Sequence, residues 1–290
     1  MSSNSFAKKV RYALRFIPDE PYIQLNYFAH FHKFANLKNP KTYNEKLNWL
    51  KLHDHNPLYT TLVDKYEVKK FIENKLGKGY CVPTLGVFDK FDDIDFDKLP
   101  NQFVLKCTHD SEGIVIVKDK SQMNLETVRL KLTRALNQNF YYIGREWPYK
   151  NVKPRIIAEP YLEDKETGEL RDYKFFCFNG IPKIMYIASG RAKNQITFDF
   201  FDLDFNHLDI KQKYPNSKIL MIKPKTFEKM IELSEIISKD FLHVRIDFYE
   251  VDGRIYIGEL TFYPMSGLSP YYPEKWDLVL GNWIQLPDNF

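Results

Sequence analysis

The most informative stretch of the chain is FVLKCTHDSEGIVIV, residues 103–117. An apolar run ends at Lys106, a short polar loop with one glycine follows, and a second β-branched run begins at Ile114. This order is typical of strand, loop, strand. A lysine at a strand end, beside small and polar loop residues, can surround a polyphosphate with a cation and backbone N–H groups. The loop lacks the Gly-Lys-Ser/Thr ending of a Walker A motif. A β-hairpin with a solvated lysine is therefore the alternative interpretation of this segment alone.

Composition narrows the class of protein. The 42 basic and 38 acidic side chains of the 290-residue chain give a net charge of +4. This balance argues against a dedicated nucleic-acid binder and suits an anionic ligand, such as a nucleotide or an acidic sugar polymer. Three isolated cysteines, without a C-x-x-C pair, fit a reduced cytoplasmic protein. We find neither a secretory signal peptide nor an apolar run approaching the roughly 18 residues of a bilayer span.

The beginning of the chain contains a short basic amphipathic segment, KKVRYALRFI, at residues 8–17. Such a segment can contact an anionic membrane surface, but it more often forms a first helix docked on its own domain. We therefore expect a cytoplasmic protein that makes at most peripheral contact at the inner face of the membrane.

The periodicity of the sequence predicts an α+β protein with three regions. Residues 1–79 are mainly helical, residues 80–160 form a small α+β lid, and residues 161–290 form a C-terminal α+β unit with an antiparallel sheet. Helices are expected at 46–52, after a capping box at Thr42–Glu45, and at 62–72, 125–136 and 226–241. Strands are expected at 82–88, 103–106, 114–117, 156–159, 172–178, 182–187, 244–249 and 254–260, with hairpin turns at 179–180 and 252–253.

Two carboxylates lie on the two strands of the last predicted hairpin. If the strands pair, Asp247 and Glu259 can face one pocket and offer hard oxygen ligands to Mg²⁺. Arg245 lies two residues before Asp247 and so points to the same face of its strand. It can pair with the acids or stabilise a transferring phosphate. For the isolated hairpin, a surface ladder of salt bridges is the alternative.

A second candidate region is the segment IIAEPYL at residues 156–162, an apolar strand that runs into a linker. A strand that runs into a linker can offer backbone groups to an adenine edge and apolar side chains to its faces. On the next predicted strand Lys174 alternates with Asp172 and could enter the same pocket.

The order of these pieces resembles that of the ATP-grasp ligases. The chain has, in sequence, an Asp-Lys pair at 64–65, a strand ending in Lys106, a phosphate loop at 107–113, and a Glu-x-x-Leu hinge at 159–162. An Arg-x-Asp strand and an acidic strand at Glu259 come last. More narrowly, it resembles the TupA-like ATP-grasp proteins of teichuronopeptide and surface-polysaccharide biosynthesis. The narrower match lies in PKTYNEKLNWLK at 40–51, VDKY at 63–66, DYKF at 172–175 and GELTFYPMSG at 258–267, and extends over roughly residues 25 to 288.

The resemblance implies a role for each matching position. Lys106 and Arg245 would be catalytic, and Asp247 and Glu259 would bind Mg²⁺. Arg245 would stabilise the acyl phosphate and its tetrahedral successor. The nucleotide would be bound by Lys65, Lys106, Thr108, His109, Ser111, Gly113, Glu159, Tyr161, Leu162, Asp172 and Lys174. The substrates would contact Arg191, Lys193, Thr261 and Ser266.

The chain departs from the family pattern at two places. Its phosphate loop has one glycine, Gly113, and two acids, Asp110 and Glu112. Thr261 occupies the usual place of a third, asparagine ligand, so the number of metal ions, one or two, stays open.

The resemblance thus implies an ATP- and Mg²⁺-dependent, ADP-forming carboxylate–amine ligase that works through an acyl phosphate. Two α+β units would clamp ATP, and an amino acid or peptide would be joined to a uronic-acid-containing surface or capsular polysaccharide or its precursor. One alternative is a glycosyltransferase that uses a sugar nucleotide through Asp202 and Asp204. The other is a non-catalytic nucleotide-binding scaffold, which Thr261 and the acidic loop keep open. No nucleic-acid partner is expected, and the oligomeric state is not determined by the sequence.

Overall fold

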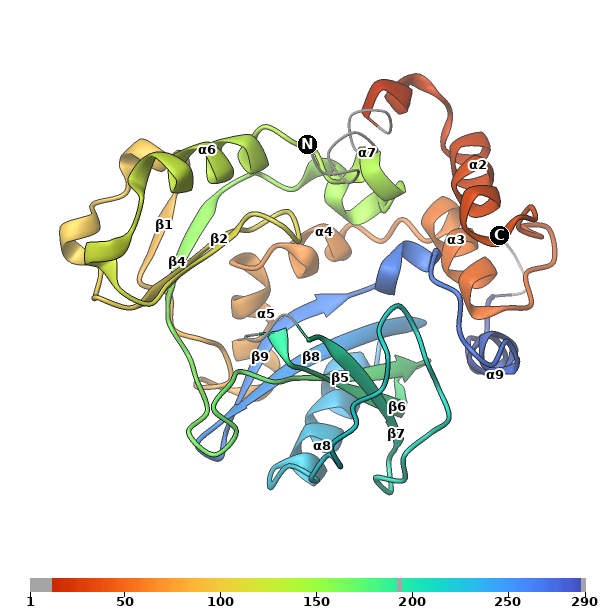
Figure 1. Ribbon diagram of the computed structural model, residues 1–290. Helices are drawn as coiled ribbons and strands as arrows, with labels where there is room; N and C mark the ends of the chain where they lie inside the picture. The colour runs from red at the N-terminus through yellow and green to blue at the C-terminus, as the bar shows by residue number, and fades with distance from the viewer. Residues whose placement is uncertain (1–11, 192–194, 288–290) are drawn as a thin grey trace. The chain divides into compact units, whose positions relative to one another are not determined.

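The computed structural model describes residues 12–191 and 195–287, and the chain forms two compact units (Figure 1). The first unit combines Met1–His55 with Glu163–Phe290, and the second is Asn56–Leu162. Residues 56–79, assigned to the N-terminal helical region from sequence, thus belong to the same unit as the predicted lid. Each unit contains one antiparallel sheet together with helices, which confirms the predicted α+β class.

The sheet of the first unit has five antiparallel strands in the order β7-β6-β5-β8-β9. Their bounds are β5 Asp172–Phe178, β6 Ile181–Ser189, β7 Thr197–Asp202, β8 His243–Val251 and β9 Arg254–Thr261. Both predicted hairpins form. Their two-residue turns have positive φ at both positions, 47° and 81° at Asn179-Gly180 and 49° and 77° at Asp252-Gly253. These are the backbone angles that Asn-Gly and Asp-Gly adopt readily in type I′ turns.

Helices cover both faces of this sheet, so all seven residues of β5 are buried. On one face, Phe175 packs against Phe227 of α8 (Phe227–Ser238), with ring centroids 5.7 Å apart. On the other, Phe176 and Phe178 contact Tyr43 of α3 (Tyr43–His53). Because strand side chains alternate, Asp172 and Lys174 share the second face with these two phenylalanines. That face is therefore polar at one end of β5 and aromatic at the other.

The N-terminal helices of the first unit begin with η1 (Leu14–Phe16) and α2 (Asp19–Phe31). Helix α3 starts with the predicted capping box, in which Thr42 and Glu45 bond to each other's backbone N–H. It packs against α9 (Lys275–Trp283), where Asp277 accepts hydrogen bonds from the Asn44 backbone and side chain. A Cβ at Gly281 would lie 2.2 Å from the Lys41 carbonyl oxygen, so this helix pair requires glycine there. The short helix η7 (Pro264–Gly267) follows β9.

The second unit contains a four-stranded antiparallel sheet of order β1-β4-β2-β3. Its strands are β1 Gly86–Phe88, β2 Phe103–Cys107, β3 Ile114–Val117 and β4 Ile156–Pro160. The α-helices are α4 Leu58–Val63, α5 Glu67–Leu76, α6 Leu125–Leu136 and α7 Tyr141–Gly144; the 3₁₀ helices are η2 Phe91–Asp93, η3 Phe96–Lys98, η4 Lys120–Gln122 and η5 Trp147–Asn151.

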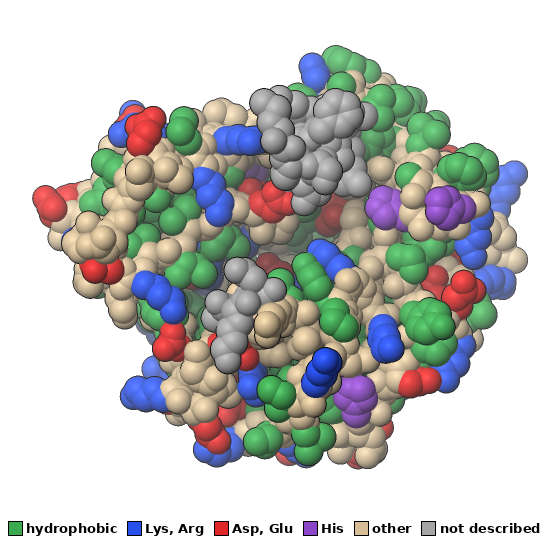
Figure 2. Space-filling model, in the orientation of Figure 1, with side chains coloured by type: hydrophobic (Ala, Val, Ile, Leu, Met, Phe, Trp, Pro, Cys, Tyr) green, Lys and Arg blue, Asp and Glu red, His purple; other side chains and the backbone are tan. Residues whose placement is uncertain are grey.

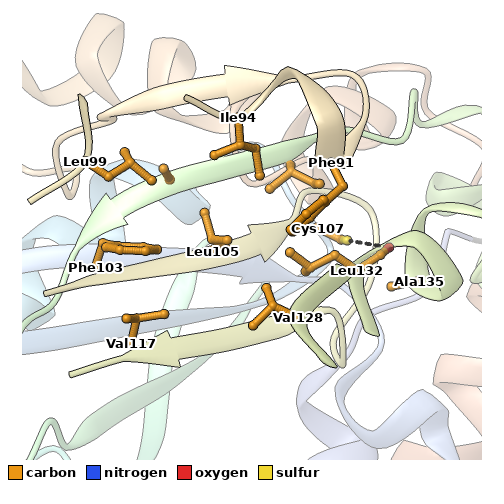
Figure 3. Close-up of a cluster of buried hydrophobic side chains, with 12 residues drawn as sticks. Phe91, Ile94, Leu99, Phe103, Leu105, Cys107, Val117, Val128, Leu132 and Ala135 are labelled. Atoms are coloured by element: carbon orange, nitrogen blue, oxygen red, sulfur yellow. Dashed lines mark hydrogen bonds between the residues drawn. The ribbon is translucent and has the colours of Figure 1, made fainter. Parts of the chain in front are cut away.

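Helix α6 covers one face of the second sheet (Figure 3). Phe103, Leu105 and Cys107, at alternate positions of β2, point into the same buried cluster as Val128 and Leu132 of the helix. The Cys107 thiol contacts the Leu132 carbonyl oxygen at 3.9 Å. This packing sets the position of the strand that ends next to the predicted phosphate loop.

Two predicted elements differ from the structure. The helix expected at 62–72 is broken at Asp64, whose backbone is extended (ψ 117°) and whose carboxylate accepts hydrogen bonds from the N–H groups of Tyr66 and Glu67. The strand expected at 82–88 is reduced to Gly86–Phe88. Its first part is held by a side chain instead, because Lys69 donates a hydrogen bond to the Val82 carbonyl at 2.9 Å.

The surface carries charges of both signs. Figure 2 shows acidic and basic side chains interspersed over the visible face, in agreement with the small net charge. Within the described ranges, no helix combines the length and the apolar character needed to cross a bilayer.

Candidate active site

The first cluster of charged residues lies on the five-stranded sheet. The register of β8 and β9 places Asp247 opposite Glu259 and Arg245 opposite Thr261, and β5 places Lys174 opposite Asp247. Directly opposed residues of antiparallel strands share a face, so the five side chains form one cluster. The hairpin thus brings together the two carboxylates and the arginine, as the sequence predicted.

Arg245 is the centre of this cluster. Its Nε and Nη2 donate to the two carboxylate oxygens of Asp247, at 2.6 and 2.8 Å, in a bidentate pair. Nη2 also lies 3.2 Å from Glu259 Oε1 and 3.1 Å from Thr261 Oγ1. Thr261 donates to Glu259 Oε1 at 3.2 Å, so the hydroxyl in the asparagine position orients a carboxylate.

Lys174 provides the second cation. Its Nζ donates to Asp247 Oδ2 and lies 3.5 Å from Asp172 Oδ1. Burial by itself would lower the pKa of Lys174, but Asp172 and Asp247 outweigh it and hold that pKa above its ordinary value. Burial raises the pKa of Asp247, and Arg245 and Lys174 act against that effect. The side chain of Asp247 is 1% exposed, whereas that of Glu259 is 36% exposed.

The two carboxylates fit a magnesium ion that takes its other ligands from phosphate oxygens and water. Mg²⁺ in nucleotide sites commonly uses one or two carboxylates in this way. Among the described residues there is no group of three His, Cys, Asp or Glu side chains able to hold a metal by themselves. An ion here would therefore depend on ligands from the nucleotide, with Glu259 the accessible carboxylate.

Asp172 and Arg191 extend the same cluster. Arg191 Nη2 lies 2.7 Å from Asp172 Oδ2, and its side chain is 54% exposed. Asp172 is buried between two cations, Arg191 and Lys174, so its expected place near a ribose stays a prediction. Arg191 presents a cation to solvent beside the carboxylate cluster, whereas Lys193 lies outside the described residues.

The second charged cluster lies in the other unit, around Glu159 on β4. Lys106 Nζ lies 2.6 Å from Glu159 Oε2, and Lys69 Nζ lies 2.6 Å from Oε1. Burial alone would raise the pKa of Glu159, but the charges of Lys106 and Lys69 outweigh it and hold that pKa below its usual range. One carboxylate thus positions the predicted phosphate lysine.

Sequence reasoning missed Lys69. Besides Glu159, its amine contacts Thr84 Oγ1 at 2.7 Å and the Val82 carbonyl at 2.9 Å, so it ties the segment before β1 to β4. The available signal was its position four residues after Lys65 of the Asp-Lys pair. Its partners, however, are distant in sequence.

The predicted phosphate loop is hydrogen-bonded to Lys65. The Lys65 N–H donates to the Thr108 carbonyl at 3.1 Å, and its amine donates to the Asp110 carbonyl. The Asp110 carboxylate accepts from the Gly113 N–H, at 3.0 Å to each oxygen. A Cβ at Gly113 would lie 2.7 Å from the Cys107 sulfur. Gly113 is thus required by close packing, and its N–H is bonded within the loop. Ser111 is exposed.

The side chains of two loop residues expected to bind phosphate are buried, and their phosphate contact stays a prediction. His109 is 3% exposed, and its Nε2 lies 3.1 Å from the carbonyl oxygens of Ala135 and Gln138 at the end of α6. Thr108 is fully buried, with its hydroxyl 3.5 Å from the Lys153 carbonyl. Both side chains anchor the loop to its own unit, because burial directs them away from solvent.

Three further predicted residues are placed as follows. Tyr161 and Leu162 are half-buried just beyond β4, and Lys118 Nζ lies 5.1 Å from the centroid of the Tyr161 ring.

Ser266 lies in a turn where it and Met265 have φ values of 57° and 50°, a left-handed conformation that is costly for residues other than glycine. The amine of Lys51 donates to the Ser266 carbonyl at 2.7 Å and hydroxyl at 3.0 Å, which holds the turn.

These arrangements agree with a comparison against known families, which matches the TupA-like ATP-grasp family over residues 45–285. The chain belongs to the TupA-like ATP-grasp family. This assignment confirms the predicted resemblance. The family supplies the expectation of ATP, and the ligase activity of this chain is a proposal that rests on it.

Two ligases are among the solved structures to which this chain is similar. An L-amino acid ligase from Bacillus licheniformis is 15% identical, with a TM-score of 0.51, over 93% of this chain and 63% of that one. A D-alanine–D-alanine ligase from Bacillus anthracis, complexed with ATP, is 17% identical, with a TM-score of 0.41, over 70% of this chain. The TupA-like chain spans only 54% of that ligase. No curated protein matches its sequence.

Proposed function

We propose that this TupA-like ATP-grasp protein joins a carboxylate to an amine at the expense of ATP. The observation that carries the proposal is the register of β8 and β9, which opposes Asp247 to Glu259 with Arg245 bonded to both. Two carboxylates with an adjacent arginine suit a magnesium–phosphate complex and the negative charge of phosphoryl transfer. Family membership supplies the expectation of ATP as the donor.

The nucleotide would be bound by the residues that the family resemblance assigns to it. Lys65 and Lys106 would bind phosphate oxygens, and half-exposed Tyr161 and Leu162 would contact the adenine. Lys106 would exchange part of its bond with Glu159 for a phosphate oxygen, and the freed Glu159 oxygen would accept from the adenine amino group. Asp247 and Glu259 would hold Mg²⁺, which supplies charge neutralisation at the phosphates.

The reaction would proceed in two steps. An oxygen of the substrate carboxylate attacks the γ-phosphorus in line, the bond to the bridging oxygen breaks, and ADP leaves with an acyl phosphate as the other product. The amine then attacks the acyl carbon, phosphate leaves, and the amine loses a proton to give the amide. Arg245 would stabilise the charge on the transferred phosphate and on the tetrahedral oxyanion, chiefly by being held in place beforehand.

The proposed carboxylate substrate is a uronic-acid-containing surface or capsular polysaccharide, or its precursor, and the proposed amine is an amino acid or short peptide. Both follow from the narrower TupA-like resemblance. Arg191, which presents a half-exposed guanidinium, would bind the uronic carboxylate, and Thr261, Ser266 and Lys193 are further proposed substrate contacts.

The test of this proposal traces the carboxylate oxygen atoms into the released phosphate. The protein is incubated with ATP, Mg²⁺, an ¹⁸O-carboxylate uronic-acid oligosaccharide and a mixture of amino acids. The expected products are ADP and ¹⁸O-labelled phosphate, formed only when both substrates are present. AMP with pyrophosphate would show an adenylating enzyme instead. UDP release from a UDP-sugar without ATP turnover would contradict ligation, and ATP binding without turnover would support a non-catalytic scaffold.

A further inference from the structure

The connection between β7 and α8, whose course can be followed in Figure 1, contains an unusual concentration of positive charge. Its residues 211–225 read KQKYPNSKILMIKPK, with five lysines and no acidic residue. In a chain with 42 basic and 38 acidic side chains, this composition is local. We refer to residues 211–225 as the basic loop.

The tip of the basic loop is aliphatic and turned to solvent. Ile219, Leu220 and Ile222 are 77%, 88% and 75% exposed, whereas Met221 between them is only 8% exposed. Met221 therefore packs against the body of the unit while its three neighbours project outward. Consecutive exposed aliphatic side chains of this kind mark an interaction surface more often than isolated ones do.

The chain before the tip is held in place by hydrogen bonds. Asn216 donates to the carbonyl oxygens of Phe198 and Ile210, at 2.8 and 3.0 Å. The N–H of Ser217 donates to the Asp199 carboxylate at 2.9 Å, and its hydroxyl accepts from the Ile219 N–H at 3.0 Å. The outward direction of the aliphatic tip is thus built into the fold of the first unit.

Lysines flank the aliphatic tip on both sides. Lys211, Lys213 and Lys218 precede it with exposed side chains. After it, Lys223 and Lys225 form ion pairs with Glu228 and Glu166, all of them well exposed to solvent. Exposed ion pairs are weak and exchange readily. The loop therefore presents an excess of positive charge around its apolar tip.

We propose that the basic loop docks the protein on the surface of an anionic lipid bilayer. Ile219, Leu220 and Ile222 would enter the boundary between headgroups and acyl chains, and the flanking lysines would face anionic headgroups. Burial of apolar side chains and attraction of lysines to anionic headgroups both strengthen binding to a membrane surface. This inference does not depend on the proposed ligase activity.

Two features of the loop favour a bilayer over other anionic partners. Three aliphatic side chains on one loop offer much less than the roughly 800 Å² per partner of a stable protein interface. An anionic polymer would be bound by lysines and by stacking on exposed aromatic rings, and aliphatic side chains would add nothing to such binding. A bilayer surface uses the apolar tip and the positive charge together.

The experiment measures flotation of the full chain with vesicles. We would compare phosphatidylcholine vesicles with vesicles that contain phosphatidylglycerol, at low and high salt. One variant replaces Ile219, Leu220 and Ile222 with Ser, and another replaces Lys211, Lys213 and Lys218 with Gln. The control for the aliphatic variant replaces Ile116 and Leu130 with Ser, because these aliphatic residues are 60% and 62% exposed. The control for the lysine variant replaces the exposed lysines Lys38, Lys70 and Lys78 with Gln.

The wild-type protein and both controls are expected to float with anionic vesicles and not with neutral ones. Each loop variant should bind at least about tenfold more weakly, with thermal unfolding unchanged. Equal binding to neutral vesicles, no binding to anionic vesicles, or loop variants that bind like wild type would overturn the proposal. Loop variants that bind like wild type would indicate that another segment, such as residues 8–17, makes the membrane contact. A concentration-dependent dimer that the Ser variant loses, without vesicle binding by wild type, would also overturn it and assign the loop to a second copy of the chain.

Discussion

Both units place a buried carboxylate between two cations, but the cations differ in their exposure to solvent. Each surrounds one buried carboxylate with two cations: Asp247 with Arg245 and Lys174, and Glu159 with Lys106 and Lys69. In the first unit the cations are themselves buried, with side chains 7% and 6% exposed. In the second the two lysines are 18% and 15% exposed.

The pKa values of the two carboxyl groups shift in opposite directions. Burial dominates at Asp247 and raises its pKa, whereas the charges of Lys106 and Lys69 dominate at Glu159 and lower its pKa. A buried charge left without its partner costs far more than one near solvent. We therefore expect stability and function to be inseparable at Asp247, and separable at Lys106.

The largest effect is expected from the opposed acids Asp247 and Glu259. Asp247→Asn and Glu259→Gln should each reduce Mg²⁺-dependent ATP turnover by at least about 10²- to 10³-fold, since each removes a carboxylate charge proposed to hold Mg²⁺ at the phosphates. Asp247→Asn should also lower the free energy of unfolding by about 3–5 kcal/mol, because Arg245 and Lys174 are left with an uncompensated buried charge. Glu259→Gln, at a side chain 36% exposed, should cost less than about 1 kcal/mol. Urea unfolding measures the stability of each variant, and a coupled ADP assay measures its turnover. Equal stabilities of the two variants would contradict the expected difference between the buried and the half-exposed carboxylate.

A smaller effect is expected at Lys106. Lys106→Ala should weaken ATP binding by about 10- to 100-fold, corresponding to about 1.5–3 kcal/mol for a charge-assisted contact, in a protein that remains folded. Lys90→Ala is the matched control, because Lys90 is a lysine of the same unit whose side chain is 70% exposed. Isothermal titration calorimetry with Mg-ATP gives both values. Unchanged affinity in the folded Lys106 variant would remove this residue from the nucleotide site.

Lys69 tests whether Glu159 must be held from both sides. Lys69→Met should weaken ATP binding by roughly fivefold, about the value of one hydrogen bond, since Lys69 acts through Glu159. Lys69→Arg, which keeps the charge, should restore part of the loss. The double variant with Lys106→Ala should be less than additive, because both lysines bind the same carboxylate. Full additivity in calorimetry would mean that the two lysines act independently.

The pH dependence of unfolding tests the lowered pKa of Glu159. A carboxyl group with a lowered native pKa stabilises the fold above its ordinary pKa of 4.5, and this contribution is lost as pH falls through the lower native value. The difference in unfolding free energy between wild type and Glu159→Gln should therefore narrow as pH falls from about 6 to about 3. Urea titrations across this range provide the measurement. A difference that stays constant would contradict the ion cluster around Glu159.

The smallest effect is expected at Asp202, the residue on which the glycosyltransferase alternative depends. Its carboxylate accepts hydrogen bonds from the N–H groups of Asp204 and Asn206, at 3.0 and 2.8 Å, and thereby closes a turn. Asp202→Asn should leave ATP turnover unchanged and cost about 1 kcal/mol of stability at most. Loss of activity in this variant, with Glu259→Gln still active, would favour the glycosyltransferase interpretation.

The amino-acid sequence determined the elements whose causes are local. Asn179-Gly180 and Asp252-Gly253 select tight turns through their tolerance of positive φ, and Thr42 with Glu45 caps α3 through neighbouring backbone groups. Turn and strand period together place Asp247 and Arg245 on one face and oppose them to the next strand. For this reason the acidic hairpin, the family resemblance and the α+β class could all be predicted from the order of residues alone.

Only the tertiary structure decided which distant residues meet. Lys69 was missed because its partners, Val82, Thr84 and Glu159, lie 13 to 90 residues away in sequence. His109 has the sequence context of a phosphate ligand, but the fold directs its imidazole to carbonyl groups at the end of α6. The aliphatic tip at residues 219–222 likewise resembles a core segment in sequence. Burial and electrostatic pairing are sums over neighbours from the whole fold, and no local pattern of residues contains them.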